Sequence, residues 1–468
     1  MVSYLVAVLL AVAPLAPGTP GGTPGDVERF LTERRVATEV PGLSYVLTDR
    51  ERIVARNAWG VDGNGRPMTP RTPVGFGSVA KSVTALGILR LVDAGTIGLD
   101  DPVIDHLPWL RLADQDHARR ITVRHLLHQT SGLPADEGYA RADRDDNDPG
   151  ALRRWVDSLA DVEPEAAPGE RHRYNPANAA ILGALAEEVT GLTFARFLDR
   201  EVFTPLDLAD AIADARTAEV SLPPGHEYYF GTVRPAPWRF DDSGVPYGYL
   251  AGSVTDLAHL ARPLLGGGEF LSPALRAELS RGGPRALGGR YGLGWRVGTL
   301  SGTDTEIVWH AGAVAGYHTV VIAAPERDLA VAVQQNAWSP LVDEQLNAAA
   351  FGALTIALGG TPAPVDESST QVAVLAGVGA LVAALAGAVG LGGWRLVRRR
   401  RRSWPVAVAW GGVGAVCAVG AGVVLPAVVG LSLRQILRFT PDLGQLAVAV
   451  VVLGSALALV RLARLCLP

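Results

Sequence analysis

The pattern of apolar and polar positions divides the chain into two parts. Residues 27 to about 360 mix charged and apolar positions as a globular domain does, whereas Ala, Val, Leu and Gly dominate the residues that follow. Three apolar segments in this second part are long enough, or nearly so, to cross a membrane as helices: residues 371–393, 406–431 and 443–460. A polar, proline-containing linker over residues 361–370 is expected to precede this membrane domain, which extends to residue 462.

Strands are predicted at both ends of the first part, with helices between them. Apolar runs bounded by turn residues predict a hairpin near the beginning and an antiparallel meander near the end, and two long helices are each closed by a glycine. This order indicates an α+β domain over residues 27–360 whose sheet joins both ends. The predicted strands are residues 43–48, 53–59, 306–309, 319–324 and 329–334, and the predicted helices run from Ser78 to about Asp93 and over about residues 177–190.

The beginning of the chain has the pattern of a targeting segment. Residues 1–16 are apolar but too short to span a bilayer comfortably, and small residues suited to cleavage precede a Pro/Gly-rich run that ends at Gly25. We therefore expect residues 1–25 to contain a signal peptide and a Pro/Gly-rich segment. Because a charged region before the apolar stretch is missing, an uncleaved anchor is the alternative.

Charge is distributed as unevenly as hydropathy. From residue 361 onward the chain has ten arginines and three acidic residues, which give a net charge of +7. Because the whole chain carries a net charge of −5, the residues before 361 carry −12. An acidic main domain argues against nucleic-acid binding, which needs a basic surface. Six arginines, at position 395 and at positions 398–402, separate the first two apolar segments, and the positive-inside rule places them in the cytoplasm. The main domain is then extracytoplasmic; Arg434 and Arg438, in the later external loop, are a weaker opposing signal.

The chain contains one lysine, Lys81, among many arginines. Arginine stays charged, whereas lysine can lose its proton at an enzymatic pH when it is buried or lies near other cations. Ser78 stands three residues earlier, at the start of a predicted helix, so the two side chains share one face of the helix. Because a serine hydroxyl is a weak nucleophile until a base takes its proton, this pattern indicates an activated serine.

The segment around Ser78 resembles the active-site segment of the class C β-lactamases, DD-peptidases and related esterases, a group that carries the S-x-x-K element. Further segments agree in the same order, and the resemblance covers about residues 27–355. It implies a β-lactamase/transpeptidase-like fold, in which helices flank an antiparallel sheet beside a helical subdomain, here followed by about three transmembrane helices. The matching segments are residues 75–85, 91–95, 99–103, 121–134, 291–295 and 310–312.

The resemblance also implies an acyl-enzyme route that uses no cofactor and no metal. Ser78 would attack a carbonyl carbon while Lys81 helps to deprotonate the serine. Tyr174 matches the tyrosine of the second motif, which shares the general-base role. A tyrosine normally has a pKa of ~10, so it needs a nearby cation to act as a phenolate. A plain core position for Tyr174 is the alternative.

The third motif of the family corresponds to residues 310–312, which the resemblance places on the edge strand beside the nucleophile. The resemblance implies that His310 and Gly312 lie beside the nucleophile and contact the substrate, and that the backbone N–H groups of Ser78 and Ala313 form the oxyanion hole. His310 could instead cap the strand, or bind substrate without being essential.

One position departs from the family pattern. Pro176 stands where the second motif has an asparagine that binds the amide carbonyl of the substrate and helps to fix the lysine. Proline has no side-chain donor and no backbone N–H, and Asn175 or Asn178 would have to act from a different angle. The departure favours ester hydrolysis over hydrolysis of peptides and β-lactams.

Other polar groups have simpler interpretations. His125 and His128 are expected to be structural rather than metal ligands, and the acidic residues 143–148 lack calcium-loop spacing and are expected to form a solvated loop. Both cysteines, Cys417 and Cys466, lie in the apolar part, so the main domain has no disulfide and no cysteine nucleophile.

The sequence therefore predicts a multi-pass membrane protein with an extracytoplasmic serine hydrolase domain. Its substrates are expected to be esters, D-amino-acid peptides or β-lactams, that is, a small-molecule or peptidoglycan-like substrate, with membrane lipid as the other partner and no nucleic acid. The alternative is a non-catalytic protein of the same fold that binds or senses cell-wall fragments, which Pro176 motivates. A transport role is disfavoured, because the apolar segments contain almost no charged residue.

Overall fold

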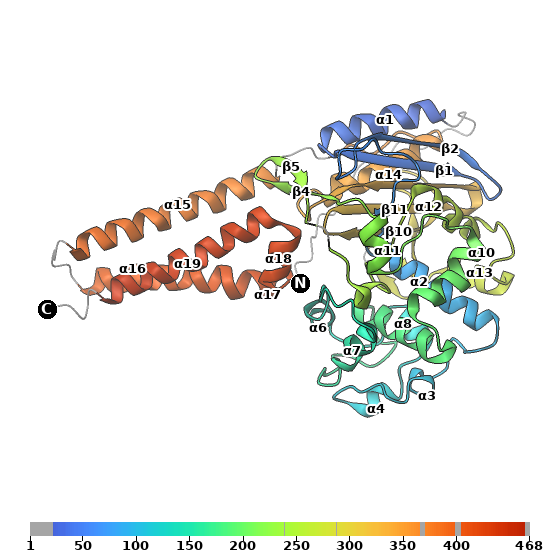
Figure 1. Ribbon diagram of the computed structural model, residues 1–468, viewed down its shortest axis with the longest axis horizontal. Helices are drawn as coiled ribbons and strands as arrows, with labels where there is room; N and C mark the ends of the chain where they lie inside the picture. Colours follow the sequence, from blue (N-terminus) through green and yellow to red (C-terminus); the bar gives the residue numbers. More distant parts are fainter. Residues whose placement is uncertain (1–21, 238, 287, 366–369, 398–403, 464–468) are drawn as a thin grey trace.

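The computed structural model describes residues 22–237, 239–286, 288–365, 370–397 and 404–463. A globular part with a central sheet carries a stalk of long helices, which projects from one side (Figure 1). The predicted signal peptide and the arginine run at 398–402 lie outside the described residues, apart from the last residues of the Pro/Gly-rich segment.

The central sheet has eight antiparallel strands and joins the two ends of the globular part, as predicted. Strands from near residue 45 pair directly with a strand from near residue 332, with Tyr45 opposite Val333. In the order of the sheet, the strands are β2 (Ile53–Gly60), β1 (Gly42–Thr48), β12 (Leu329–Gln335), β11 (Tyr317–Ala324), β10 (Glu306–Val314), β9 (Arg296–Thr299), β8 (Gly289–Tyr291) and β7 (Arg285–Ala286).

Helices cover both faces of this sheet, which accounts for the burial of its central strands β1, β11 and β12 on both faces. One face packs on α1 (Pro24–Ala37) and α14 (Asp343–Ala357) through residues such as Leu31, Val333 and Leu354. The other face packs on α2 (Val79–Asp93) and α12 (Val254–Ala261). Pro24 and Gly25, expected to lie in the Pro/Gly-rich segment, instead form the first turn of α1, because the Thr23 side chain caps that helix and proline is well suited to its first turn.

A helical subdomain packs around α2 and the buried helix α8, and it lies below the sheet in Figure 1. Its α8 begins with Asn175 as N-cap and ends at Gly191 in a left-handed conformation. The remaining helices of the globular part are α3 (Val103–His106), α4 (Gln115–Ala118), α5 (Val123–Leu127), α6 (Ala135–Ala140), α7 (Ala151–Asp157), α8 (Pro176–Thr190), α9 (Phe194–Leu198), α10 (Thr204–Leu206), α11 (Ala215–Ser221) and α13 (Pro273–Arg281).

Two small sheets complete the globular part. In one, β13 (Ala337–Trp338) pairs with β4 (His226–Tyr229), which pairs with β5 (Thr232–Pro235). In the other, β3 (Val74–Gly75) pairs with β6 (Ala251–Gly252). The second pair matters for function, because it ties the residues before Ser78 to the loop that ends at Leu250.

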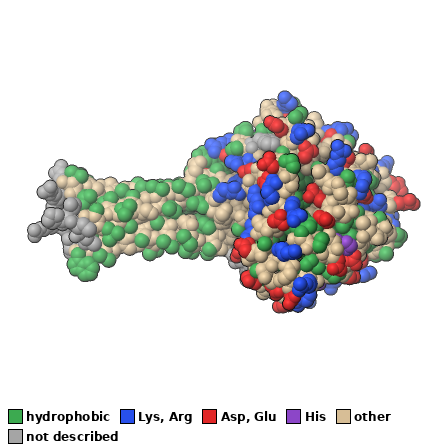
Figure 2. All heavy atoms as spheres, turned by 60° about the horizontal axis from the view of Figure 1, so that its bottom comes forward, with side chains coloured by type: hydrophobic (Ala, Val, Ile, Leu, Met, Phe, Trp, Pro, Cys, Tyr) green, Lys and Arg blue, Asp and Glu red, His purple; other side chains and the backbone are tan. Residues whose placement is uncertain are grey.

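The stalk contains three helices that are long and apolar enough to cross a membrane: Gln371–Val397, Trp404–Val429 and Pro441–Ala463. On the face shown in Figure 2 the stalk has uncharged side chains along its described length, whereas charged side chains of both signs cover the globular part. The elements are α15 (Thr370–Val397), α16 (Trp404–Val419), α17 (Leu425–Val429), α18 (Leu433–Phe439) and α19 (Pro441–Ala463). Short α18 lies at the junction with the globular part (Figure 1).

Candidate active site

Ser78 and Lys81 meet at the start of α2. Ser78 occupies the N-cap position, and Lys81 Nζ donates a hydrogen bond to Ser78 Oγ over 3.1 Å. Ser78 is partly exposed, whereas its neighbours on both sides are buried. The hydroxyl therefore faces solvent with its partner nitrogen behind it, which is the arrangement that an activated serine requires.

Lys81 is buried, with 5% of its surface exposed. Its Nζ also donates to the backbone carbonyl of Tyr247 over 2.7 Å, and it lies 4.9 Å from the centre of the Tyr174 ring. Burial lowers the pKa of Lys81 below its ordinary value; the nearby Tyr174 phenol opposes this shift, and Arg296 adds to it. A lowered pKa makes a lysine better suited to accept a proton, so Lys81 is the candidate base next to the hydroxyl.

Strand β10 passes very close to the backbone that precedes Ser78. A Cβ on Gly312 would lie 2.0 Å from the carbonyl oxygen of Phe76 and 2.6 Å from the backbone nitrogen of Ser78. A Cβ on Gly77, which has a φ of +51°, would lie 2.3 Å from the backbone nitrogen of Ala313. Only glycine fits at these two positions. The contact between the two segments brings the backbone nitrogens of Ser78 and Ala313 near each other.

This strand is longer than the sequence pattern predicted. The predicted strand ended at residue 309, but β10 continues to Val314 because small residues there allow it to lie against the start of α2. Strand β9 pairs with β10 only as far as Trp309, opposite Arg296. Residues 310–314 therefore extend along the nucleophile beyond the end of β9.

Tyr174 and His310 belong to a cluster of rings behind the serine. The Tyr174 ring centre lies 6.2 Å from that of His310 and 5.8 Å from that of Tyr291. Nδ1 of His310 lies 2.7 Å from the Ala311 carbonyl oxygen and Nε2 lies 3.1 Å from the Tyr291 hydroxyl. Since a carbonyl only accepts, Nδ1 carries the proton and the Tyr291 hydroxyl donates to Nε2. Burial, Arg296 and Lys81 all lower the pKa of His310, in keeping with this neutral form.

The two asparagines near Pro176 are occupied elsewhere. Asn175 is fully buried; its Oδ1 accepts from the Ala177 N–H and its Nδ2 donates to the Pro134 carbonyl over 2.6 Å. Asn178 is also fully buried and donates to Gln129 Oε1 over 2.8 Å. Both side chains hold the beginning of α8 in place, so neither is available as a donor to a substrate. Lys81 is held instead by the Tyr247 carbonyl.

The acidic run at 143–148 is a loop with exposed residues at 145, 147 and 148, as predicted, but it is not solvated throughout. Asp143 is buried and accepts a hydrogen bond from the Tyr249 hydroxyl over 2.6 Å. Asp145 pairs with Arg239, and Asp146 with Arg154. Within the described residues, no group of three or more His, Cys, Asp or Glu side chains is arranged to hold a metal ion, and His125 completes the capping box of α5.

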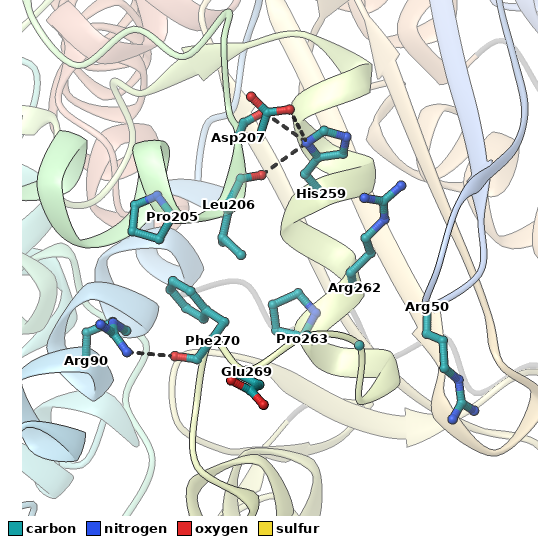
Figure 3. Close-up of a pocket in the computed structure, with 12 residues that line it drawn as sticks. Arg50, Arg90, Pro205, Leu206, Asp207, His259, Arg262, Pro263, Glu269 and Phe270 are labelled. Carbon is teal, nitrogen blue, oxygen red and sulfur yellow. Dashed lines mark hydrogen bonds and ion pairs between the residues drawn. The ribbon is translucent and has the colours of Figure 1, made fainter.

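A cavity of about 550 Å³ lies elsewhere on the globular part (Figure 3). Its walls carry Arg50, Arg90, His259 and Arg262, and His259 Nδ1 lies 2.9 Å from the Asp207 carbonyl oxygen. None of the residues that surround Ser78 lines it. The side chains that carry chemistry are therefore separate from this cavity.

Three contributors to the site were not identified from the sequence. Tyr291 lies in one of the matching segments but was given no role of its own. No sequence pattern indicated Arg296, whose guanidinium carbon lies 5.5 Å from the Tyr174 ring centre. The third contributor is the Tyr247 carbonyl, a backbone group that any residue type could supply.

The fold and the placement of Ser78 and Lys81 are those of the S-x-x-K group of proteins. The β-lactamase family profile matches residues 27–354. The chain belongs to the β-lactamase family.

Individual relatives support this membership. Penicillin-binding protein 4 of Amycolatopsis lactamdurans is 35% identical over 206 residues, which are 43% of this chain and 52% of that protein. The matched region thus spans about half of that relative's length. The octameric penicillin-binding protein homologue from Pyrococcus abyssi superposes with a TM-score of 0.61 at 27% identity, over 72% of this chain and 78% of that one. EstCE1, a hydrolase with promiscuous acyltransferase activity, shares the fold with a TM-score of 0.58 at 22% identity, over 70% and 98% of the two chains.

Proposed function

We propose that this chain is a membrane-anchored serine hydrolase that forms an acyl-enzyme on Ser78. The observation that carries the proposal is the buried Lys81, whose Nζ lies 3.1 Å from the serine hydroxyl and whose pKa is lowered by burial. The proposed substrates are esters, D-amino-acid peptides or β-lactams. The relative described as a penicillin-binding protein supports an acyl-transfer reaction of this kind.

In the proposed reaction, Ser78 Oγ bonds to the carbonyl carbon of the substrate as its proton passes to Lys81 Nζ. The resulting oxyanion accepts hydrogen bonds from the N–H groups of Ser78 and Ala313, and a single donor of this kind is often worth ~3 kcal/mol. When the bond to the leaving group breaks, the leaving group takes the proton from Lys81, with Tyr174 sharing the transfer. Water then attacks the acyl-enzyme by the same proton route and releases the acid.

The substrate is proposed to lie along residues 310–314 of β10. Because β9 pairs with β10 only as far as Trp309, the edge of β10 beyond that residue is the proposed contact for the substrate backbone. His310 is buried beneath the Tyr174 and Tyr291 rings, so its proposed role is to support Tyr174 rather than to touch substrate directly. With Pro176 in the place of the motif asparagine, esters are the favoured substrates, because their recognition depends less on an amide donor.

The catalytic domain is proposed to lie on the extracytoplasmic side. It precedes the first span, and α18, between the second and third spans, lies against it, so both are on one side of the membrane. Arg395 then belongs to the opposite, cytoplasmic side. Arg434 and Arg438 count against this topology by the charge rule, but both contact the catalytic domain. Arg438 contacts Asp145, and Arg434 contacts the Asp143 carbonyl.

The test uses the full chain in detergent, exposed separately to a penicillin and to an activated short-chain ester, with Ser78→Ala as the matched control. Intact mass and turnover are recorded. An adduct or turnover confined to the Ser78 protein supports the proposal, and the preferred reagent separates penicillin-binding from esterase behaviour. If the folded protein shows neither with either reagent, the proposal fails, and the non-catalytic binding protein suggested by Pro176 takes its place.

A further inference from the structure

The short helix α18 is joined to the globular part by buried polar contacts. Gln435 has 1% of its surface exposed. Its Nε2 donates to the Tyr139 carbonyl over 2.8 Å and to Asp143 Oδ2 over 3.0 Å. Burying an amide is costly unless it is hydrogen-bonded, so these contacts specify where α18 lies.

Arg438 makes a second set of contacts one turn further along. Its side chain is 6% exposed; Nη1 lies 2.9 Å from Asp145 Oδ1, and Nη2 donates to the Tyr249 hydroxyl over 2.7 Å. Arginine offers donors in a fixed, planar fork, which suits it to hold two partners at once. It therefore joins the loop at residue 145 to the loop at residue 249.

These two loops lead directly to the catalytic lysine. The Tyr249 hydroxyl donates to Asp143, so Tyr249 is held by Asp143 and by Arg438. Tyr247, two residues earlier, accepts the 2.7 Å hydrogen bond from Lys81 Nζ. A pocket beside this loop is lined by Gly75, Tyr249, Val314 and Arg438, which places the arginine between the segment before Ser78 and the end of β10.

We propose that α18 is a positioning element of the active site: Gln435 and Arg438 fix the Asp143 and Tyr249 loops, and so hold the Tyr247 carbonyl against Lys81. The proposal rests on the function proposed for Ser78 and Lys81. It assigns to the membrane part a role beyond anchoring, because an anchor alone requires no buried hydrogen bonds to loops beside the nucleophile.

The single lysine of the chain allows a direct test that does not depend on activity. The full chain is produced with ¹³Cε-labelled lysine, so that one side-chain signal reports the titration of Lys81 by NMR. The variants are Arg438→Met and Gln435→Ala, each compared with Arg119→Met, which removes an arginine from an exposed ion pair with Asp116. Thermal unfolding identifies the variants that remain folded. Gln435→Ala is the milder variant, because it retains the contacts of Arg438.

In the folded variants of α18 we expect the titration midpoint of Lys81 to move upward, toward the ordinary value of a lysine, because water reaches a nitrogen that the Tyr247 loop no longer covers. The rate of Ser78 acylation should fall about tenfold, as expected for a small displacement of catalytic groups. An unchanged midpoint in folded Arg438→Met and Gln435→Ala overturns the proposal. If the wild-type chain forms no acyl-enzyme, the proposed function fails, while the midpoint still decides whether α18 positions Lys81.

Discussion

The side-chain nitrogen of Lys81 donates a 2.7 Å hydrogen bond to the backbone carbonyl of Tyr247, which lies 166 residues away in sequence. The same nitrogen reaches Ser78 Oγ. When Lys81 loses a proton, the neutral amine can still donate to the Tyr247 carbonyl, while its lone pair accepts a hydrogen bond from the Ser78 hydroxyl. The position of the base therefore depends on main-chain geometry rather than on an asparagine side chain.

Lys81→Arg should reduce the rate of acylation by about 10²- to 10⁴-fold, because arginine keeps the charge but cannot accept a proton. Stopped-flow measurement with an activated ester would show the loss. Arg119→Lys, an exchange between the same two residue types at an exposed site, serves as control and should retain the wild-type rate. A Lys81→Arg enzyme within threefold of wild type would exclude Lys81 as the base.

The pH dependence should follow the lowered pKa of Lys81. Its basic form increases as pH rises, so kcat/KM should increase through a midpoint below the ordinary lysine value of about 10.4. A pH–rate profile of the native chain measures this midpoint. A rise in kcat/KM centred at or above the ordinary pKa of lysine would contradict the assignment of Lys81 as the base.

Stability should respond to the same shift. Between the lowered pKa of the folded state and the ordinary pKa of the unfolded state, the unfolded chain binds more protons, so stability rises with pH across that window. Burial of a protonatable Lys81 therefore destabilises the protein most below its folded pKa. The Tm of Lys81→Met minus that of wild type should be larger at pH 6 than at pH 10, as differential scanning calorimetry would show. A Tm difference independent of pH would argue against a lowered pKa of Lys81.

Gly312→Ala should abolish acylation and destabilise the domain by about 1–3 kcal/mol, because its Cβ would meet Phe76 O and Ser78 N at distances that no side chain adopts. Gly25→Ala in α1 is the matched control, since a Cβ there meets only Thr23 Oγ1 at 3.6 Å, an ordinary contact. Urea unfolding and ester turnover are measured for both. Equal effects of the two substitutions would show that the close approach of β10 does not matter.

Tyr174→Phe should lower the acylation rate by about 10²-fold or more if its hydroxyl shares the proton transfer. Tyr291→Phe removes only the hydrogen bond to His310, so it should cost about 1 kcal/mol of stability and less than tenfold in rate. Burst kinetics and thermal unfolding distinguish the two variants. The role of Tyr174 is disproved if its variant behaves like that of Tyr291.

Pro176→Asn restores the asparagine of the second motif. A new amide donor worth about 1 kcal/mol should raise the ratio of β-lactam acylation to ester turnover by about fivefold. Both rates are measured on the same preparation, with Asn178→Ala as a comparison that disturbs the start of α8 without adding a donor. If the ratio does not change, Pro176 is not what limits amide recognition.

Much of the fold could be predicted because its signals are local. The helix that follows Ser78 has an apolar face and ends near a glycine, and it runs over Val79–Asp93 as expected. Apolar runs bounded by turn residues gave strands β1 and β12 to within one residue at each end. Local patterns of this kind need no knowledge of distant partners.

What could not be predicted depends on partners far away in the chain. Residues 311–313 are small, so their alternation gave no strand signal, and only the approach to Ser78 explains why β10 continues. Asp143 belongs to an acidic run that composition places in solvent, yet Gln435 and Tyr249 bury it. The acceptor for Lys81 is a carbonyl, which has no signature in residue type.

The start of α19 also touches the globular part. Gln445 Oε1 accepts from the Tyr229 hydroxyl over 2.8 Å, and Asp442 accepts from the Phe230 N–H over 3.2 Å. Together with α18, these contacts fix the orientation of the catalytic domain relative to the third span. With the spans in a bilayer, the height of Ser78 above the lipid is constant, and so is the direction that its side of the domain faces. On the proposed function, the enzyme samples a thin layer next to the membrane, and its substrates have to be presented within that layer, where encounters are governed by diffusion along the surface.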